Sequence, residues 1–179
     1  YYALHDDEPA EVDEALREQY LPRFAGDALP ATRTGMALSI ADKLDTIAGI
    51  YATGQKPSGT RDPFGLRRAA LGLLRTSIER GLDLDLQQLI GQAVAAAQAD
   101  MARVAVEQGK ALGAIDTGKL AVEVYDYVIE RLRAYYVEGT ADITVSVEAF
   151  DAVLATRPAS ALDFDARLRA LVQFLQLPD

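Results

Sequence analysis

Apolar residues recur every three or four positions along most of the chain, and this spacing constrains the fold more than any other feature of the sequence. A step of three or four residues returns a side chain to the same face of an α-helix. The clearest run has steps of 4, 4, 3 and 4 and consists of Met36, Ile40, Leu44, Ile47 and Tyr51. The alternation of apolar and polar residues that marks a half-buried strand is almost absent. We therefore predict an all-α fold, an irregular bundle of about six to eight helices.

Proline, glycine and capping residues set the expected ends of these helices. The expected helices cover residues 9–20, 32–53, 62–80, 119–137 and 146–156, together with one capped by Asp83 or Asp85 that reaches about residue 111, and a last one that begins at Asp163 or Asp165. The helical pattern breaks between Gly113 and Gly118. We therefore predict two regions, 1–112 and 113–179.

The composition excludes several kinds of site. The chain has 179 residues, half of them hydrophobic, which is enough for one sizeable core or two small ones. It contains no cysteine and one histidine, which excludes disulfide scaffolds, thiolate zinc sites, cysteine nucleophiles and any site that needs two histidines from this chain. No apolar run approaches the ~20 residues of a membrane span, and nothing resembles a signal peptide. Because the chain opens without methionine in what reads as the tail of a helix, we expect a piece of a larger cytoplasmic protein.

One stretch is basic in an otherwise acidic chain. Residues 56–80 contain six basic and two acidic side chains, a net charge of +4, so the other 154 residues must carry −13 to give the −9 of the whole chain. This balance argues against indiscriminate binding to nucleic acid, but it leaves room for a local basic patch. Guanidinium groups and the backbone amides at a helix start both favour phosphate. We therefore predict phosphate contacts by Lys56, Arg61, Arg67, Arg68 and Arg75.

The helix in this basic stretch is expected to start at Asp62 as its N-cap, with Pro63 at the first helical position. Along one face of the helix lie the small residues Gly65, Ala69, Gly72 and Thr76. Two glycines inside a helix cost about 1 kcal/mol each relative to alanine. We therefore expect this face to allow close approach of another backbone, from protein or from nucleic acid. The alternative is a helix packed on both sides, whose arginines pair with acidic residues elsewhere in the chain.

A candidate metal site combines His5 and Asp6 with Asp42. One imidazole and two carboxylates form a reasonable ligand set for a divalent metal, and a bound metal can make water nucleophilic near neutral pH. The simpler interpretation is that His5 and Asp6 cap a helix and that Asp42 is a solvated helical residue. The residue chemistry alone favours this simpler interpretation.

A tyrosine-rich stretch is the last candidate, and it contains Tyr125, Tyr127, Tyr135 and Tyr136. Aromatic rings of this kind can stack on the bases of single-stranded RNA. Tyrosines at the edge of a helical core would give the same pattern, and we favour that interpretation.

Five segments of the chain resemble, in the same order, signature segments of the β subunit of bacterial tetrameric glycyl-tRNA synthetase. They are YALHD at 2–6, YLPRFAGD at 20–27, ADKLDTIAG at 41–49, GTRDPFGLRRAALG at 59–72 and DFDAR at 163–167. The resemblance runs from residue 1 to about residue 179. It implies the later part of an HD-like helical domain at 1–112, followed at 113–179 by a helical connector toward the C-terminal, anticodon-binding region.

In that family the α subunit forms glycyl-adenylate from glycine and ATP, whereas the β subunit binds tRNA and is needed for charging. The resemblance therefore implies a chain without catalytic residues of its own, which positions tRNA(Gly) and helps to scaffold the complex with the α subunit. It also implies no cofactor in this chain, with ATP and Mg²⁺ used by the holoenzyme.

HD domains are named after a metal-binding H…HD…D pattern, and the doublet His5-Asp6 and Asp42 fall at its second and last positions. The resemblance implies that this set is vestigial, on a phosphohydrolase scaffold reused to bind RNA or a partner subunit. Two alternatives stay open. The chain could be a metal-dependent HD phosphohydrolase that acts on a nucleotide, or it could be a purely structural helical connector.

Overall fold

The computed structural model of the chain describes residues 5, 8–24, 26–57, 61–111, 113–137 and 141–177. Its helices are α2 (Ala10–Glu18), α3 (Arg33–Ala52), α4 (Leu66–Glu79), α5 (Leu86–Glu107), α6 (Thr117–Ile129), α7 (Leu132–Val137), α8 (Val147–Ala155) and α9 (Ala161–Leu175). The prediction of an all-α fold is therefore confirmed. The relation to HD domains stays a prediction.

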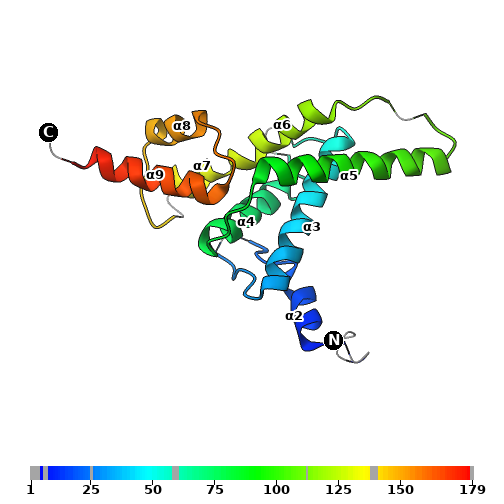
Figure 1. Cartoon of the computed structure of the whole chain (residues 1–179), viewed down its shortest axis with the longest axis horizontal. Helices are drawn as coiled ribbons and strands as arrows, with labels where there is room; N and C mark the ends of the chain where they lie inside the picture. The colour runs from blue at the N-terminus through cyan, green and yellow to red at the C-terminus, as the bar shows by residue number, and fades with distance from the viewer. Residues whose placement is uncertain are drawn as a thin grey trace.

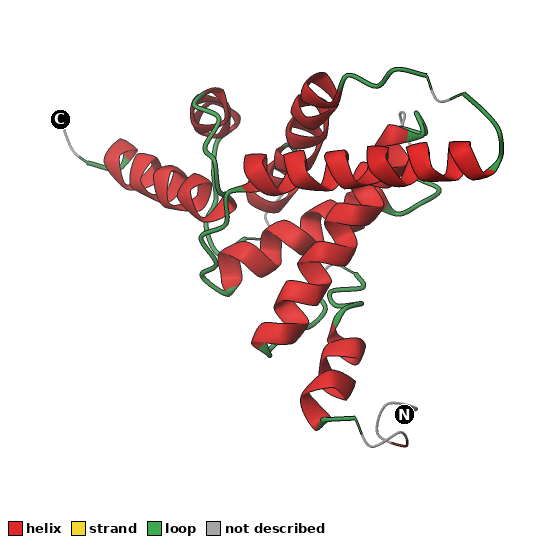
Figure 2. Ribbon diagram, turned by 45° about the vertical axis from the view of Figure 1, so that its right-hand side comes forward, coloured by secondary structure: helices red, strands yellow, loops and turns green. Residues whose placement is uncertain are grey.

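Helix α3 is central to the arrangement, because α2, α4 and α5 all pack against it. Helix α5 also packs along α6, and α4 extends the contacts to α6, α7 and α9. Figures 1 and 2 show α2 at one end of the molecule and the α8–α9 pair at another, with the far half of α5 reaching out beyond its neighbours. Helix α4 therefore lies between the N-terminal helices and the C-terminal ones.

One contiguous apolar core joins the helices from α3 to α9. Each of them supplies at least one fully buried side chain, namely Ile47, Leu73, Val94, Val128, Leu132, Phe150 and Phe164 in chain order. Complete burial of a side chain of this size stabilises the folded state by about 1.5–3 kcal/mol. Core residues lie on both sides of residues 113–118, and the boundary between regions 1–112 and 113–179 stays a prediction.

Side-chain oxygens cap the starts of α3, α5, α6, α8 and α9, which satisfies backbone amides that a helix start leaves without a partner. For α5 the cap is Asp85, one of the two residues expected. For α9 the expectation was wrong, because Ser160 is the cap and its Oγ accepts a hydrogen bond from Asp163 N at 3.0 Å. Asp165 is instead buried, and its Oδ1 accepts a hydrogen bond from Tyr136 Oη at 2.6 Å.

The single helix expected over 119–137 is two helices, α6 and α7. At the junction the amides of Arg131 and Arg133 bond to carbonyls three residues back, rather than four. This tight turn redirects the chain, so that Tyr136 of α7 stacks near Phe164 of α9, with ring centroids 6.4 Å apart. The expected single helix failed because periodicity reports a buried face but not a change in the helix that it packs against.

Helix α4 begins later than expected. Gly65 precedes it with φ 66°, a left-handed conformation that glycine adopts without strain, and Leu66 is the first helical residue. Asp62 is therefore not the N-cap, and Pro63 is not in the first turn. The Asp62 carboxylate nonetheless accepts hydrogen bonds from Leu66 N at 2.8 Å and Arg67 N at 3.0 Å. From a turn outside the helix, Asp62 therefore supplies acceptors for two backbone amides of the first helical turn.

Candidate nucleic-acid interface

Three of the five basic residues predicted to contact phosphate come together beside the loop that joins α2 to α3. Arg67, Arg68 and Arg75 of α4 line a small cavity of about 150 Å³. The other side of this cavity is formed by Pro22 and Phe24 of the loop. The guanidinium groups of α4 thus lie next to the aromatic ring of Phe24, which is far away in the sequence.

Phe24 and Arg23 are members of this site that the sequence interpretation missed. The Phe24 side chain is 57% exposed, and the Arg23 guanidinium carbon lies 5.7 Å from its ring centroid. Arg23 is held by Asp27, whose Oδ2 accepts from both Arg23 Nε and Arg23 N at 2.9 Å. The hydrogen bond from the Arg23 side chain keeps the pKa of Asp27 well below its usual range. The signal that the sequence offered was an arginine next to a phenylalanine in the loop segment between Pro22 and Pro30.

The arginines of α4 differ in how much they are used inside the protein. Arg68 is exposed and makes no ion pair with the part of the chain that the structure describes. Its guanidinium folds back over Gly65, where Nη2 would lie 2.9 Å from an added Cβ. The Arg75 side chain is only 13% exposed, and its Nε contacts Glu79 Oε1 at 2.7 Å. Arg67, like Arg75, is half-buried.

The other two predicted residues lie away from this cavity. Lys56 forms an ion pair with Glu123 of α6, and its hydrogen bond lowers the pKa of that carboxyl group. Arg61 is exposed in the segment before α4. Phosphate contacts by Lys56, Arg61, Arg67, Arg68 and Arg75 stay a prediction. The pairs made by Lys56 and Arg75 also fit the alternative in which basic residues neutralise the acidic excess of the chain.

The small-residue face of α4 is in contact with protein. A Cβ on Gly72 would lie 3.1 Å from Pro22 Cγ and Cδ and 3.2 Å from Lys43 Cε, which is tighter than nearly all ordinary contacts. Thr76 is fully buried, and its Oγ1 donates to Gly72 O at 2.8 Å. Gly72 therefore lets the Pro22 ring pack directly on α4, and this packing places Phe24 next to the arginines.

The candidate metal set is only partly described. His5 and Asp42 are exposed, and Asp6 lies outside the described residues. Among the residues that the structure describes, no group of three His, Asp or Glu side chains could hold a metal ion. The vestigial site at His5, Asp6 and Asp42 therefore stays a prediction.

The tyrosine-rich stretch belongs to the core, as favoured above. Tyr125, Tyr135 and Tyr136 are buried, and Tyr127 is half-buried with its ring 5.3 Å from that of Tyr51. Tyr125 Oη donates to Pro158 O at 2.6 Å. Because these rings pack inside the protein, they offer no platform for a base.

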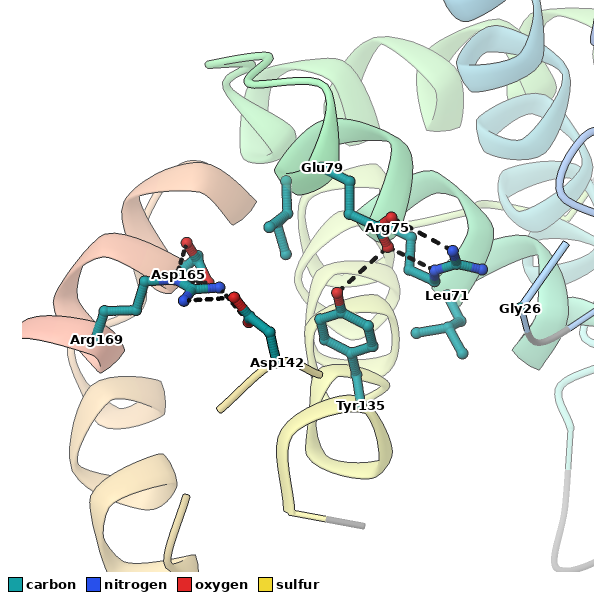
Figure 3. Close-up of a pocket in the computed structure, with 9 residues that line it drawn as sticks. Gly26, Leu71, Arg75, Glu79, Tyr135, Asp142, Asp165 and Arg169 are labelled. Atoms are coloured by element: carbon teal, nitrogen blue, oxygen red, sulfur yellow. Dashed lines mark hydrogen bonds and ion pairs between the residues drawn. The ribbon is translucent and has the colours of Figure 1, made fainter. Parts of the chain in front are cut away.

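A second and larger cavity, of about 820 Å³, lies between α4 and the C-terminal helices. Figure 3 shows the Arg75–Glu79 pair on one wall and Arg169 between Asp142 and Asp165 on the other. Tyr135 Oη donates to Glu79 Oε1 at 3.3 Å, and burial raises the pKa of Tyr135 to about 12. Most of the charged groups on these walls are paired, although Arg75 Nη1 is buried without a hydrogen-bond partner in the described part of the chain. The cavity thus lies between two parts of the fold.

None of the described helices is both long and apolar enough to span a membrane. The family model of the glycyl-tRNA synthetase β subunit matches residues 1–155. The glycine–tRNA ligase β subunit of Hahella chejuensis is 47% identical over 99% of this chain, and that of Pseudomonas fluorescens strain Pf0-1 is 48% identical over all of it. The chain spans about a quarter of the length of these curated relatives, 23% and 24% respectively. From the family model and this identity along the whole sequence, the chain belongs to the glycyl-tRNA synthetase β-subunit family.

Proposed function

We propose that the chain works within a full-length β subunit to bind tRNA(Gly) and position it for charging in the cytoplasm. The α subunit, which forms glycyl-adenylate with ATP and Mg²⁺, is the proposed partner. The contact is assigned to a surface that we call the Arg–Phe surface, which consists of Arg23, Phe24, Arg67 and Arg68. The observation that carries the proposal is an exposed phenylalanine with guanidinium groups on two different segments around it.

This combination suits a flexible or single-stranded part of an RNA. A base that leaves its stack can lie on an aromatic ring, a contact worth about 1–3 kcal/mol. Guanidinium groups close by can bind the adjoining phosphates, often through two parallel hydrogen bonds. An RNA segment of two or three nucleotides would therefore find a ring and two or more cations within one small area.

The charge of the rest of the chain supports a localised contact. The chain as a whole carries −9, so most of its surface repels a polyanion. Binding is therefore expected to depend on a few cations and to weaken with salt in proportion to the number of phosphates contacted. The proposal assigns neither glycine recognition nor adenylate formation to these residues.

The test is tRNA charging by the assembled enzyme with Arg67→Ala/Arg68→Ala in its β subunit. The matched control is Arg17→Ala/Arg103→Ala, which removes the same charge from two arginines whose side chains are each 64% exposed. KM for tRNA and its dependence on salt are measured together with glycine-dependent ATP–pyrophosphate exchange, which reports adenylate formation without tRNA.

We expect the Arg67→Ala/Arg68→Ala enzyme to show a raised KM for tRNA and a salt slope that is shallower by about one unit per lost phosphate contact. Pyrophosphate exchange should be unchanged, and the control enzyme should behave like the wild type. If KM and the salt slope match those of the control, the assignment is wrong. The alternative of a purely structural connector, which the packing of Gly72 and Arg75 favours, would then take its place.

A further inference from the structure

Two buried charges hold the loop between α2 and α3, and neither of them forms an ion pair with another described side chain. Lys43 of α3 is 6% exposed and Glu18 of α2 is 1% exposed. A buried charge without an opposite charge is costly unless other polar groups surround it. In both cases those polar groups are supplied mainly by the main chain of the loop.

Lys43 gathers carbonyl oxygens at the start of the loop. Its Nζ donates to Leu21 O at 2.8 Å, to Gln19 O at 3.1 Å and to Ser39 Oγ at 2.7 Å. An ammonium group has three protons, so these three acceptors satisfy it completely. Ser39 Oγ in turn donates a hydrogen bond to Leu21 O at 2.8 Å, which is a second bond at the same carbonyl.

Glu18 gathers amides at the end of the loop. Its two carboxylate oxygens accept from Ala31 N at 2.7 Å, from Thr32 N at 3.0 Å and from Thr32 Oγ1 at 2.6 Å. Arg80 of α4 adds a hydrogen bond from Nη2 to Leu29 O at 3.1 Å. The loop is thus fixed at both ends from the inside, while Arg23 and Phe24 between these ends stay exposed.

The Lys43 contact is the one that sets where the exposed tip lies against α4. Leu21, whose carbonyl Lys43 holds, precedes Pro22, and the Pro22 ring packs on Gly72 beside the Lys43 side chain. Arg23 and Phe24 follow directly. A shift of the Leu21 carbonyl would therefore move the Phe24 ring relative to the arginines of α4.

We propose that Lys43 is a positioning residue for RNA binding, because its bonds to the main chain fix the tip Arg23–Phe24 in register with Arg67 and Arg68. The inference rests on the proposed function of the Arg–Phe surface. It assigns Lys43 no contact with RNA, since its ammonium group is buried and fully bonded.

The test is a double-mutant cycle in the assembled enzyme with Lys43→Met and Phe24→Ala. Lys43→Met keeps a side chain of similar length but removes every hydrogen bond of the ammonium group. KM for tRNA is measured beside pyrophosphate exchange. We expect Lys43→Met alone to raise KM for tRNA by about fivefold, the effect of a change near 1 kcal/mol. In an enzyme that already carries Phe24→Ala, Lys43→Met should raise KM much less, because the ring that it positions is gone.

Two results would overturn the inference. One is an unchanged KM for Lys43→Met, and the other is a fold-increase in KM that is as large in the Phe24→Ala enzyme as in the wild type, which is what a general loss of stability gives. If Lys43→Met does not yield folded enzyme, Ser39→Ala replaces it under the same criterion. It removes the bond from Ser39 Oγ to Leu21 O and one acceptor of Lys43, and it leaves the Lys43 bonds to Leu21 O and Gln19 O in place. The Arg67→Ala/Arg68→Ala enzyme separates the two proposals. If that enzyme loses affinity for tRNA while the Lys43 cycle fails, the Arg–Phe surface stands and only the positioning role falls.

Discussion

Arg68 and Arg75 lie two turns apart on α4, and the two ends of that helix put the same side chain to different uses. Arg68 is exposed in a cavity wall that includes the ring of Phe24. Arg75 is mostly buried, is paired with Glu79, and faces the cavity shared with the C-terminal helices (Figure 3). Both side chains line the small cavity beside Phe24, but Arg75 is held by the carboxylate of Glu79, whereas Arg68 makes no ion pair with the described part of the chain. The function of a guanidinium group thus follows from its neighbours, and the spacing along the helix does not determine it.

The strongest effect is expected in the cavity that Arg75 shares with the C-terminal helices, from Asp165→Ala. Asp165 is buried and accepts hydrogen bonds from Tyr136 Oη at 2.6 Å and from Arg169 Nε at 2.8 Å. Its removal leaves a buried hydroxyl and a half-buried guanidinium without that partner, a loss of about 3 kcal/mol. Hydrogen exchange of α9 peptides in the full-length protein should speed up by about a hundredfold, while Asp165→Asn should have a smaller effect. Unchanged exchange in α9 would show that the cavity network does not hold the helix.

A smaller effect is expected where the two ends are compared directly, with Arg68→Ala and Arg75→Ala. A charge-assisted hydrogen bond to phosphate contributes about 1.5–3 kcal/mol, so Arg68→Ala should weaken tRNA binding roughly tenfold or more and flatten its salt slope by about one unit. Arg75→Ala should leave the salt slope unchanged and instead speed hydrogen exchange around residues 135–137. Equal salt slopes for the two variants would remove the distinction between the ends of α4.

The next prediction concerns acid and the loop tip. Because the pKa of Asp27 in the folded protein is lowered, chiefly by the Arg23 hydrogen bond, its ionised form stabilises the loop above the unfolded value of 3.8. That contribution should fade as the pH falls below this value toward the folded pKa. Hydrogen-exchange protection of peptides covering 19–30 should therefore decrease below about pH 4, after correction for the intrinsic exchange rate. In Asp27→Asn this part of the pH dependence should be absent, and a variant that still shows it would exclude Asp27 as the cause.

The smallest effect is expected at the vestigial metal set. His5→Ala/Asp42→Ala should leave tRNA charging and the metal content of the dialysed full-length protein unchanged, because the resemblance implies a site that no longer binds metal. Elemental analysis measures the metal content, and an aminoacylation assay measures the charging. One equivalent of a transition metal that disappears in the variant would instead support the HD phosphohydrolase alternative.

The sequence predicted the parts of this fold that depend on local pattern. Helical spacing located α3 and α5 to within a few residues, and the five ordered segments led to the family. The start of α4 was predicted wrongly because Asp62-Pro63 is a good local start, whereas the left-handed Gly65 and the bonds from Leu66 and Arg67 to Asp62 favour a later one.

The candidate site depended on contacts that local pattern does not contain. Arg67 and Arg68 were predicted from charge, but Arg23 and Phe24 join them only because Pro22 packs on Gly72 from a distant loop. Local pattern does not indicate that Lys43 is buried, because the carbonyls of Gln19 and Leu21 that accept its hydrogen bonds come from a distant loop. Long-range packing therefore decided both the membership of the site and the difference between its arginines.

The most direct test of the central claim is hydrogen exchange of the assembled enzyme with and without tRNA(Gly), because it observes both ends of α4 in one experiment. The account predicts that tRNA slows exchange in peptides covering 19–30 and the start of α4, and that Arg67→Ala/Arg68→Ala abolishes this protection. Peptides covering 135–137 and α9 should be unaffected. Protection confined to the C-terminal helices, or none in either region while tRNA is bound, would contradict the assignment of RNA binding to the Arg–Phe surface.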